Sequence, residues 1–183
     1  MSLYVRIIVH RRVIRLIEKM LSDLLHGGII RRTRLLTGCV EMPSLRLLAD
    51  PGEMHSGVIK ALEKQDIEIE ITKLEAGDYV AYNRIGFERM TIDDILKLIF
   101  GDRRLLSQIK DLAGHYERPV LIIEGEDPFC SGQTINPGSI QGFLKIIAVS
   151  IRVPVIFTLN EDETAEVVSS IATAEHESLT QSE

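Results

Sequence analysis

Short apolar runs alternate with amphipathic segments along most of this chain and predict a layered α/β domain. The strand-like runs lie at residues 46–49, 67–72, 78–82, 85–88, 120–123 and 153–158. Between them, apolar residues recur at helical spacing near residues 56–64, 91–99, 103–116, 137–150 and 161–176. The run 120–123 is apolar throughout, as is typical of a central parallel strand. Strands that alternate with helices in this way predict a central mixed sheet flanked by helices.

The first 44 residues differ from the rest in pattern and in charge. Apolar and basic residues from Tyr4 to Leu25 have helical spacing, and Gly27-Gly28 is a suitable end for such a helix. Residues 1–47 carry nine Lys and Arg against three Asp and Glu, a net charge of +6, whereas the rest carries 12 against 24, a net charge of −12. The basic face suits either contact with nucleic acid or plain exposure to water. We therefore expect a basic helical extension at 1–44, an α/β domain at 45–178 and a disordered tail at 179–183.

Composition narrows the class of protein. Hydrophobic residues make up 45% and charged residues 26% of 183 residues, which is typical of a soluble globular domain with a real core. No apolar run approaches the roughly 18 residues that span a bilayer, so no membrane association is expected. Cys39 and Cys130 lack metal-ligand spacing, and no secretory signal is visible, which favours an intracellular location. The acidic body argues against sequence-independent coating of DNA but allows a local basic groove.

Acidic residues fall at or near the ends of four predicted strands, at Asp50, Asp78, Glu88 and Glu124. Asp78 and Glu88 are ten positions apart on the two arms of a predicted hairpin, so their carboxylates can meet at one divalent cation. Mg²⁺ takes oxygen ligands and keeps several of its waters, so two or three carboxylates suffice to bind it. Such an ion polarises a phosphate and acidifies its bound water, and the pair therefore indicates metal-dependent cleavage of phosphodiesters.

Several motifs in the same order make residues 46–177 similar to the XPF-type nuclease domain of archaeal XPF and Hef proteins and their eukaryotic relatives. The motifs are Asp50-Pro51-Gly52-Glu53, Gly77-Asp78-Tyr79, Glu88-Arg89-Met90 with Asp94, Arg104-Leu105-Leu106-Ser107-Gln108, Arg118-Pro119-Val120 through Glu124-Gly125, Val153 through Phe157, and Glu163-Thr164-Ala165. The resemblance implies a restriction-endonuclease-like fold of the PD-(D/E)XK type. It also implies an endonuclease that needs Mg²⁺ or Mn²⁺ and cuts branched DNA such as flaps and forks in DNA repair.

Carried over residue by residue, the resemblance implies a set of site residues. The catalytic candidates are Asp50, Glu53, Asp78, Glu88 and Arg89. Of these, Asp78 and Glu88 are the expected metal ligands, with Asp50 as a third. The candidates for DNA binding are Arg103, Arg104 and Arg84. Arg104 matches the basic residue that opens the helix after the glutamate motif, although a double arginine at a helix start also works as a solvated pair.

Two residues depart from the family pattern, because Gly52 replaces an arginine and Met90 replaces a lysine. A thioether carries neither charge nor proton, and the loss of one preorganised electrostatic group typically costs on the order of 10²–10³ in rate. Lys73 or Lys97 can substitute for the missing cation, or both are surface lysines. Three functions stay open: an active nuclease, an impaired relative that binds DNA or a partner, and a regulatory module without a DNA role.

The family usually dimerises through the last helices of this domain. Apolar residues at helical spacing occur there at Ile140, Phe143, Leu144, Ile146, Ile147, Val167, Val168 and Ile171. They suit ordinary core positions, but they are numerous enough to cover both a core face and a partner face. The resemblance therefore leads us to expect a homodimer, or a heterodimer with an XPF-like partner.

Overall fold

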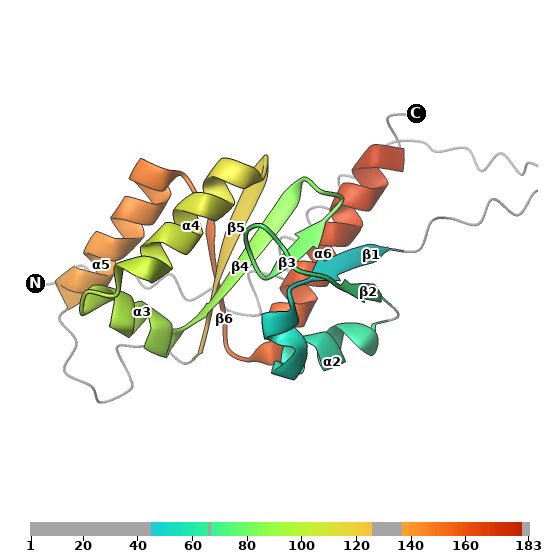
Figure 1. Ribbon diagram of the computed structural model, residues 1–183, viewed down its shortest axis with the longest axis horizontal. Helices are drawn as coiled ribbons and strands as arrows, with labels where there is room; N and C mark the ends of the chain where they lie inside the picture. The colour runs from blue at the N-terminus through green and yellow to red at the C-terminus, as the bar shows by residue number, and fades with distance from the viewer. Residues whose placement is uncertain (1–44, 66, 126–136, 181–183) are drawn as a thin grey trace, which may run out of the picture. The chain divides into compact units, whose positions relative to one another are not determined.

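A six-stranded mixed sheet lies at the centre of the protein in the computed structural model, which describes residues 45–65, 67–125 and 137–180 (Figure 1). The strands are β1 (Arg46–Ala49), β2 (Glu68–Ile71), β3 (Tyr79–Ala81), β4 (Ile85–Thr91), β5 (Arg118–Glu124) and β6 (Val155–Thr158). Their order across the sheet is β2-β1-β3-β4-β5-β6. β3 is antiparallel to both β1 and β4, whereas the other neighbouring pairs are parallel. The predicted mixed sheet is thus confirmed. The predicted basic helix within 1–44 lies outside the described residues.

Helices cover both faces of this sheet. They are η1 (Pro51–His55), α2 (Gly57–Glu63), α3 (Ile92–Ile99), α4 (Arg103–His115), α5 (Pro137–Lys145), a π-helical continuation η2 (Ile146–Ile151) and α6 (Glu161–Thr180). On one face, α2 and α6 pack on apolar side chains such as Phe87 and Ile122. On the other face, α3, α4 and α5 pack on a second core that contains Met90 and Ile123. In the described ranges, no helix has the length and apolar character needed to cross a lipid bilayer.

Several boundaries differ from the sequence prediction. β4 runs on to Thr91 rather than ending at Glu88, because its last four residues pair with 121–124 of the central strand β5. Glu88 therefore lies within a strand and not at its end. At the other end of the chain, α6 continues to Thr180, so the helix extends into the segment predicted as a disordered tail.

The start of α3 agrees with the prediction of a threonine cap. The Thr91 side chain accepts a hydrogen bond from the Asp94 backbone N–H, and the Asp94 carboxylate accepts from the Thr91 N–H and hydroxyl, which completes a capping box. Asp94, which matches the family motif, therefore serves as a cap. The Lys97 ammonium pairs with the same carboxylate at 2.8 Å, so it is not a free cation for the acidic site.

The turn between β3 and β4 is tied to α6 by ion pairs. Tyr82 and Asn83 have positive φ, as a tight hairpin turn requires. Arg84 follows them and donates through Nε and Nη2 to Glu117, and through Nη1 to Glu175. The Glu175 carboxylate is 2% exposed and also accepts from Arg118. The network holds the hairpin in place and gives Arg84 a structural role.

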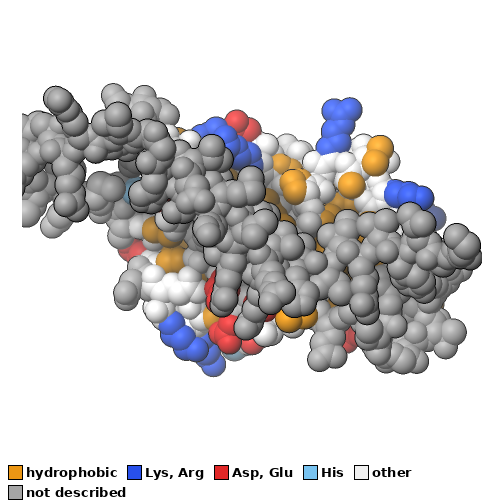
Figure 2. All heavy atoms as spheres, turned by 180° about the vertical axis from the view of Figure 1, so that it is seen from behind, with side chains coloured by type: hydrophobic (Ala, Val, Ile, Leu, Met, Phe, Trp, Pro, Cys, Tyr) orange, Lys and Arg blue, Asp and Glu red, His pale blue; other side chains and the backbone are white. Residues whose placement is uncertain are grey.

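The apolar residues predicted for a partner face divide between core and surface. Ile140, Phe143 and Ile147 are buried in the core beside α4, and Val168 is buried in the opposite core, with Val167 and Ile171 packed against it. The exposed apolar residues of this region are Ile146, Val149, Phe157 and Leu159. Figure 2 views the protein from behind, so α5, on the left in Figure 1, lies on the right. On that side, hydrophobic side chains lie between Lys and Arg side chains. The helical spacing thus identified the core face, while the exposed residues lie beside it and on β6.

Candidate active site

Asp78 and Glu88 lie opposite each other on the same face of the sheet. β3 pairs with β4 in a register that sets Tyr79 against Phe87, and the Asp78 N–H continues the ladder by donating to the Phe87 carbonyl at 2.7 Å. One step further along this register, Asp78 faces Glu88. Directly opposed side chains in an antiparallel pair have Cβ atoms about 4.5–5.5 Å apart. Because Tyr79 and Phe87 point toward α2 and α6, the two carboxylates point toward α4.

Both carboxylates carry a strong bias toward the protonated form. Burial raises the pKa of Asp78 to about 7. A hydrogen bond from the Arg89 N–H acts to lower this pKa, whereas repulsion from Glu53 adds to the rise. Burial also raises the pKa of Glu88 to about 8, and the negative charges of Asp78, Glu53 and Asp111 add to the shift. Glu88 is 4% exposed, and its carboxylate has no hydrogen bond or ion pair within the described ranges. Two buried carboxylates are therefore held together, and no Lys, Arg or His side chain of the described residues pairs with either of them.

This donor set fits a hard divalent cation. Mg²⁺ typically takes one or two protein carboxylates and fills its octahedron with water and substrate oxygens. The raised pKa values mean that a cation relieves the repulsion and the desolvation that otherwise favour protons. Among the residues that the structure describes, no three His, Cys, Asp or Glu side chains form a metal-binding group. The site therefore offers a pair of ligands, Asp78 and Glu88, rather than a complete protein cage.

The carboxylate of Asp50, the third predicted ligand, is already occupied by donors. Its Oδ1 accepts from the Gly52 N–H at 2.9 Å and caps η1, while Oδ2 accepts from Lys73 Nζ at 3.0 Å and from the Leu74 N–H at 3.1 Å. Burial alone raises its pKa, but these donors outweigh burial and hold the pKa of Asp50 below its usual value. A carboxylate with three donors is a poor additional metal ligand. Lys73, by contrast, brings an exposed cation to the edge of the acidic group.

Glu53 lies on η1, and polar contacts hold it in place. The Tyr79 hydroxyl donates to its Oε2 at 2.5 Å, and Arg89 Nη1 lies 3.5 Å from the same atom. Its charge raises the pKa of both Asp78 and Glu88, so it belongs to the same acidic group. The sequence motif placed Glu53 with the acidic residues, whereas its hydrogen bond from Tyr79 was not foreseen.

The Arg89 side chain lies on the opposite face of the sheet from Glu88. Its guanidinium forms a two-pronged pair with Glu124, with Nε to Oε2 at 2.9 Å and Nη2 to Oε1 at 2.6 Å. It also lies 3.8 Å from Glu161 at the start of α6. Only its backbone N–H, at 2.7 Å from Asp78 Oδ2, contacts the acidic pair directly. In this arrangement Arg89 organises the site and is not free to bind a phosphate.

Met90 shares the face of Glu88 but contributes only packing. It is 2% exposed and lies in the core with Ile95, Ile109 and Leu121. The position that carries a lysine in the family pattern thus places an apolar side chain beneath the acidic pair. Gly52, the second departure, lies on exposed η1 without a positive φ, so a side chain there is compatible with the backbone.

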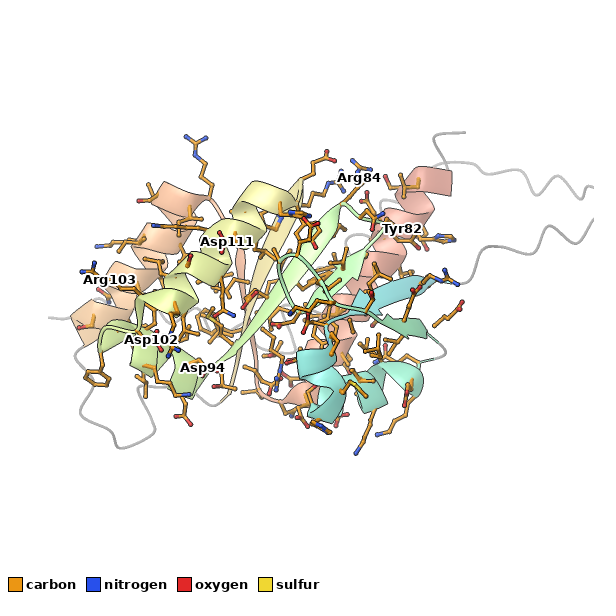
Figure 3. The ribbon with its side chains drawn as sticks, in the orientation of Figure 1. Tyr82, Arg84, Asp94, Asp102, Arg103 and Asp111 are labelled. Carbon is orange, nitrogen blue, oxygen red and sulfur yellow. The ribbon has the colours of Figure 1, made fainter. Side chains whose placement is uncertain are left out.

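The three arginines predicted to bind DNA lie at two different places. Arg103 and Asp102 lie at the N-terminal end of α4, whereas Arg84 lies beside the β3–β4 turn and α6 (Figure 3). Arg103 is exposed and has no carboxylate partner within the described ranges. The side chain of Arg104 is 89% exposed and pairs with Asp102 at 2.8 Å. Arg103 and Arg104 are therefore accessible to a phosphate, whereas the donors of Arg84 are committed to Glu117 and Glu175.

Some residues near the site were not selected from the sequence. Tyr79 was seen only as part of a motif, Glu124 only as one of several acids near strand ends, and Thr164 only as part of a helix motif. Asp111 on α4 was not selected at all, although its charge acts on Glu88 (Figure 3). For Tyr79, Glu124 and Thr164 the available signal was their place in family motifs, because their contacts span 26 to 40 positions of sequence. Asp111 lies in none of these motifs.

Comparison with known proteins gives one consistent result. The ERCC4 domain family matches residues 49–171. A protein of Methanocaldococcus jannaschii provisionally described as an ATP-dependent RNA helicase is 38% identical over 107 residues, which cover 58% of this chain and 13% of that protein. The 3'-flap repair endonuclease Xpf of Saccharolobus solfataricus is 29% identical over 128 residues, which cover 70% of this chain and 54% of that protein. The chain thus spans about half or less of these relatives.

The solved structures of XPF from Aeropyrum pernix have the same architecture. The protein alone superposes with a TM-score of 0.65 at 28% identity, over 74% of this chain and 67% of that one. Its complex with DNA superposes with a TM-score of 0.67 at 29% identity, over 72% of this chain and 65% of that one. These matches confirm the restriction-endonuclease-like fold expected from the motifs.

The acidic pair makes the stability of the metal-free domain depend on pH. Asp78 and Glu88 retain protons up to pH values near 7 and 8, whereas in the unfolded chain they lose them near 4. The folded state therefore binds more protons in this window, so the free energy of unfolding falls as pH rises from about 4 to about 8. At about 1.4 kcal/mol for each pKa unit, shifts of this size in two groups predict a fall of several kcal/mol from this pair. Denaturant unfolding from pH 5 to 8 measures it.

The matched comparison for this pH dependence is Asp78→Asn, which keeps the shape of the side chain and removes one of the two charges. Its unfolding free energy should fall less steeply with pH than that of the unchanged protein. Equal slopes for the two proteins would contradict the assignment of buried, mutually repelling carboxylates.

Proposed function

The chain belongs to the ERCC4 domain family of XPF-type DNA repair nuclease domains, and from this premise we propose that it is a Mg²⁺- or Mn²⁺-dependent endonuclease domain that cuts branched DNA such as flaps and forks. The observation that carries the proposal is the buried pair Asp78 and Glu88, which are opposed across two strands and have no basic side chain paired with them among the residues that the structure describes. The name of the relative from Saccharolobus solfataricus, a 3'-flap repair endonuclease, supports a flap as substrate, and the complex of the Aeropyrum pernix protein with DNA supports DNA binding. An intracellular location is part of this proposal.

Each residue has a distinct part in the proposed reaction. The carboxylates of Asp78 and Glu88 hold the ion, which when bound polarises the scissile phosphate and acidifies a water molecule. The Arg89 N–H orients Asp78 through its 2.7 Å hydrogen bond, and Glu53 adds negative charge beside the pair. Lys73, held by Asp50 at 3.0 Å, supplies positive charge at the edge of this acidic group. Arg103 and Arg104 bind the DNA backbone, and Arg104 can grip a phosphate with two N–H groups.

A second candidate function follows from Met90. Its apolar side chain lies where the family pattern has a lysine beside the reacting phosphate. Lys73 reaches only the rim of the site, through Asp50. An impaired domain that binds DNA or a partner without efficient cutting is therefore the alternative to an active nuclease.

A homodimer completes the proposal. A shallow groove of about 500 Å³ is lined by Leu144, Ala148, Arg152, Val153, Pro154, Val155 and Phe157. Phe157 is 55% exposed on β6, the last strand of the sheet, and Val149 on η2 is 73% exposed. A strand edge next to apolar side chains can pair with a second copy of itself around a twofold axis. We therefore assign the partner face to η2 and β6 rather than to the apolar residues of α6.

The activity is tested on fork and 3'-flap DNA with Mg²⁺ or Mn²⁺. Asp78→Asn should abolish cutting while leaving DNA binding intact, because the residue holds the ion and does not contact the DNA backbone. Arg103→Ala with Arg104→Ala should instead weaken DNA binding, measured by fluorescence anisotropy at low salt, and reduce its salt dependence. If the unchanged protein cuts none of these substrates with either metal, the proposal of an active nuclease is excluded. The absence of binding even at low salt would favour a module without a DNA role.

Restoring the missing cations distinguishes the active domain from the impaired one. The lysine stem of Met90→Lys can occupy the space of the methionine, and its ammonium can extend toward the carboxylate of Glu88. In an impaired domain, Met90→Lys with Gly52→Arg should raise the cutting rate on the order of 10²-fold. Robust cutting by the unchanged protein with no gain in the double variant would exclude impairment. Lys97→Arg, at a cation already committed to Asp94, is the control.

The assembly is tested by light scattering at tens of micromolar protein. Val149→Lys places a charge in the proposed interface and should convert the dimer to a monomer. Phe100→Lys is the matched control, because Phe100 is 79% exposed but lies at the end of α3, outside the proposed face on η2 and β6. A monomeric mass for the unchanged protein would contradict the proposed assembly.

A further inference from the structure

A buried polar network on the α6 side of the sheet ends at Glu53, a residue of the acidic group. It begins at Thr158 on β6, whose hydroxyl lies 2.8 Å from that of Thr164 on α6. The Thr164 hydroxyl donates to Glu124 Oε2 at 2.7 Å. Thr164 is 0% exposed and Glu124 is 8% exposed. Neither residue has a part in the proposed reaction, yet their buried polar groups are fully paired. Burying such groups would cost stability if any one partner were missing.

Glu124 holds the Arg89 guanidinium in one orientation. Two of its hydrogen bonds come from Arg89 and a third comes from Thr164. Burial by itself raises the pKa of Glu124, but these donors outweigh burial and hold the pKa of Glu124 below its usual value. The side chain is therefore an ionised carboxylate. A two-pronged pair between planar groups fixes the direction of the remaining nitrogen. That nitrogen, Nη1, points at Glu53 Oε2 from 3.5 Å.

Glu53 depends on such contacts because its helix is not anchored by packing. η1 has five residues, and none of them is buried. The position of Glu53 is set by the Tyr79 hydroxyl, the Arg89 guanidinium and the cap that Asp50 provides to η1. Without Arg89 in its fixed orientation, the carboxylate keeps only one strong hydrogen bond and can turn toward solvent.

We infer that Thr164 and Glu124 are positioning residues for the acidic site: through Arg89 they hold Glu53 beside Asp78 and Glu88. The inference rests on the proposed function, because it assigns these residues to a metal-binding group. It also means that the start of α6 and the end of β6, next to the proposed dimer face, are linked by hydrogen bonds to the site.

The test uses Thr164→Val, which keeps the shape of the side chain but removes the hydroxyl. Thr164→Ser restores the hydroxyl, and Thr173→Val makes the same change at an exposed position of the same helix. Glu124→Gln is a second disrupting variant that retains the size of the side chain. Three quantities are measured: the carbonyl ¹³C chemical shift of the Glu53 side chain in metal-free protein, the dissociation constant for Mn²⁺ by calorimetry, and the thermal unfolding temperature.

Thr164→Val and Glu124→Gln should both move the Glu53 carboxyl resonance and weaken Mn²⁺ binding by about tenfold, the lower end for residues that orient metal ligands. Thr164→Ser and Thr173→Val should change neither. A lower unfolding temperature with an unmoved resonance and unchanged Mn²⁺ binding would reduce Thr164 to a packing role and overturn the inference. Should Thr164→Val not fold, Glu124→Gln decides by the same readouts.

The outcome is separable from that of the proposed function. If the unchanged protein binds Mn²⁺ but does not cut DNA, the nuclease proposal fails while the positioning of Glu53 is still decided by the resonance. If the protein cuts DNA and the resonance stays in place in both disrupting variants, only the inference fails.

Discussion

The antiparallel pairing of β3 with β4 determines where the two buried carboxylates of the site lie. Tyr79 stands against Phe87, and this register sets Asp78 opposite Glu88 on the α4 face. A slip of one residue would send Glu88 to the other face and separate the two carboxylates. Three contacts oppose such a slip: the Asp78 N–H bonds to the Phe87 carbonyl, the Arg89 N–H bonds to Asp78, and Gly77 turns with a φ of +79° against the Phe87 backbone, where a Cβ would not fit.

β4 separates two polar systems that differ in their balance of charge. On the α6 side, the Arg89 guanidinium pairs with the Glu124 carboxylate through two hydrogen bonds and reaches Glu53 with its third nitrogen. On the α4 side, Asp78 and Glu88 repel each other in a buried place. Stability therefore resides in the first system, while the second keeps an unfavourable charge that a cation relieves. This division is what a metal site needs, because a carboxylate that is already paired binds a cation weakly.

Met90 has a clear physical meaning in this arrangement. It extends the apolar core of α3, α4 and α5 up to the acidic pair, with 2% of its surface exposed. The core gains a well-packed side chain, and the site lacks a positive charge at the point where the family pattern supplies one. The same substitution therefore favours folding and disfavours electrostatic stabilisation of a reacting phosphate. Lys73, which pairs with Asp50 at the rim of the site, supplies positive charge at a different position from that of the family lysine.

The sequence alone determined the class of fold, the succession of strands and helices along the chain, and the motifs that single out Asp78, Glu88 and Glu53. These features are local, since hydrophobic periodicity, helix caps and short motifs act over a few residues, as the Thr91 cap of α3 illustrates. Only the tertiary structure decided that Glu88 lies within a strand, that Arg89 turns to the opposite face toward Glu124, and that Arg84 is committed to Glu175. Each of these depends on a partner 33 to 91 positions away, and the choice of such a partner is made by the packing of strands and helices rather than by neighbouring residues.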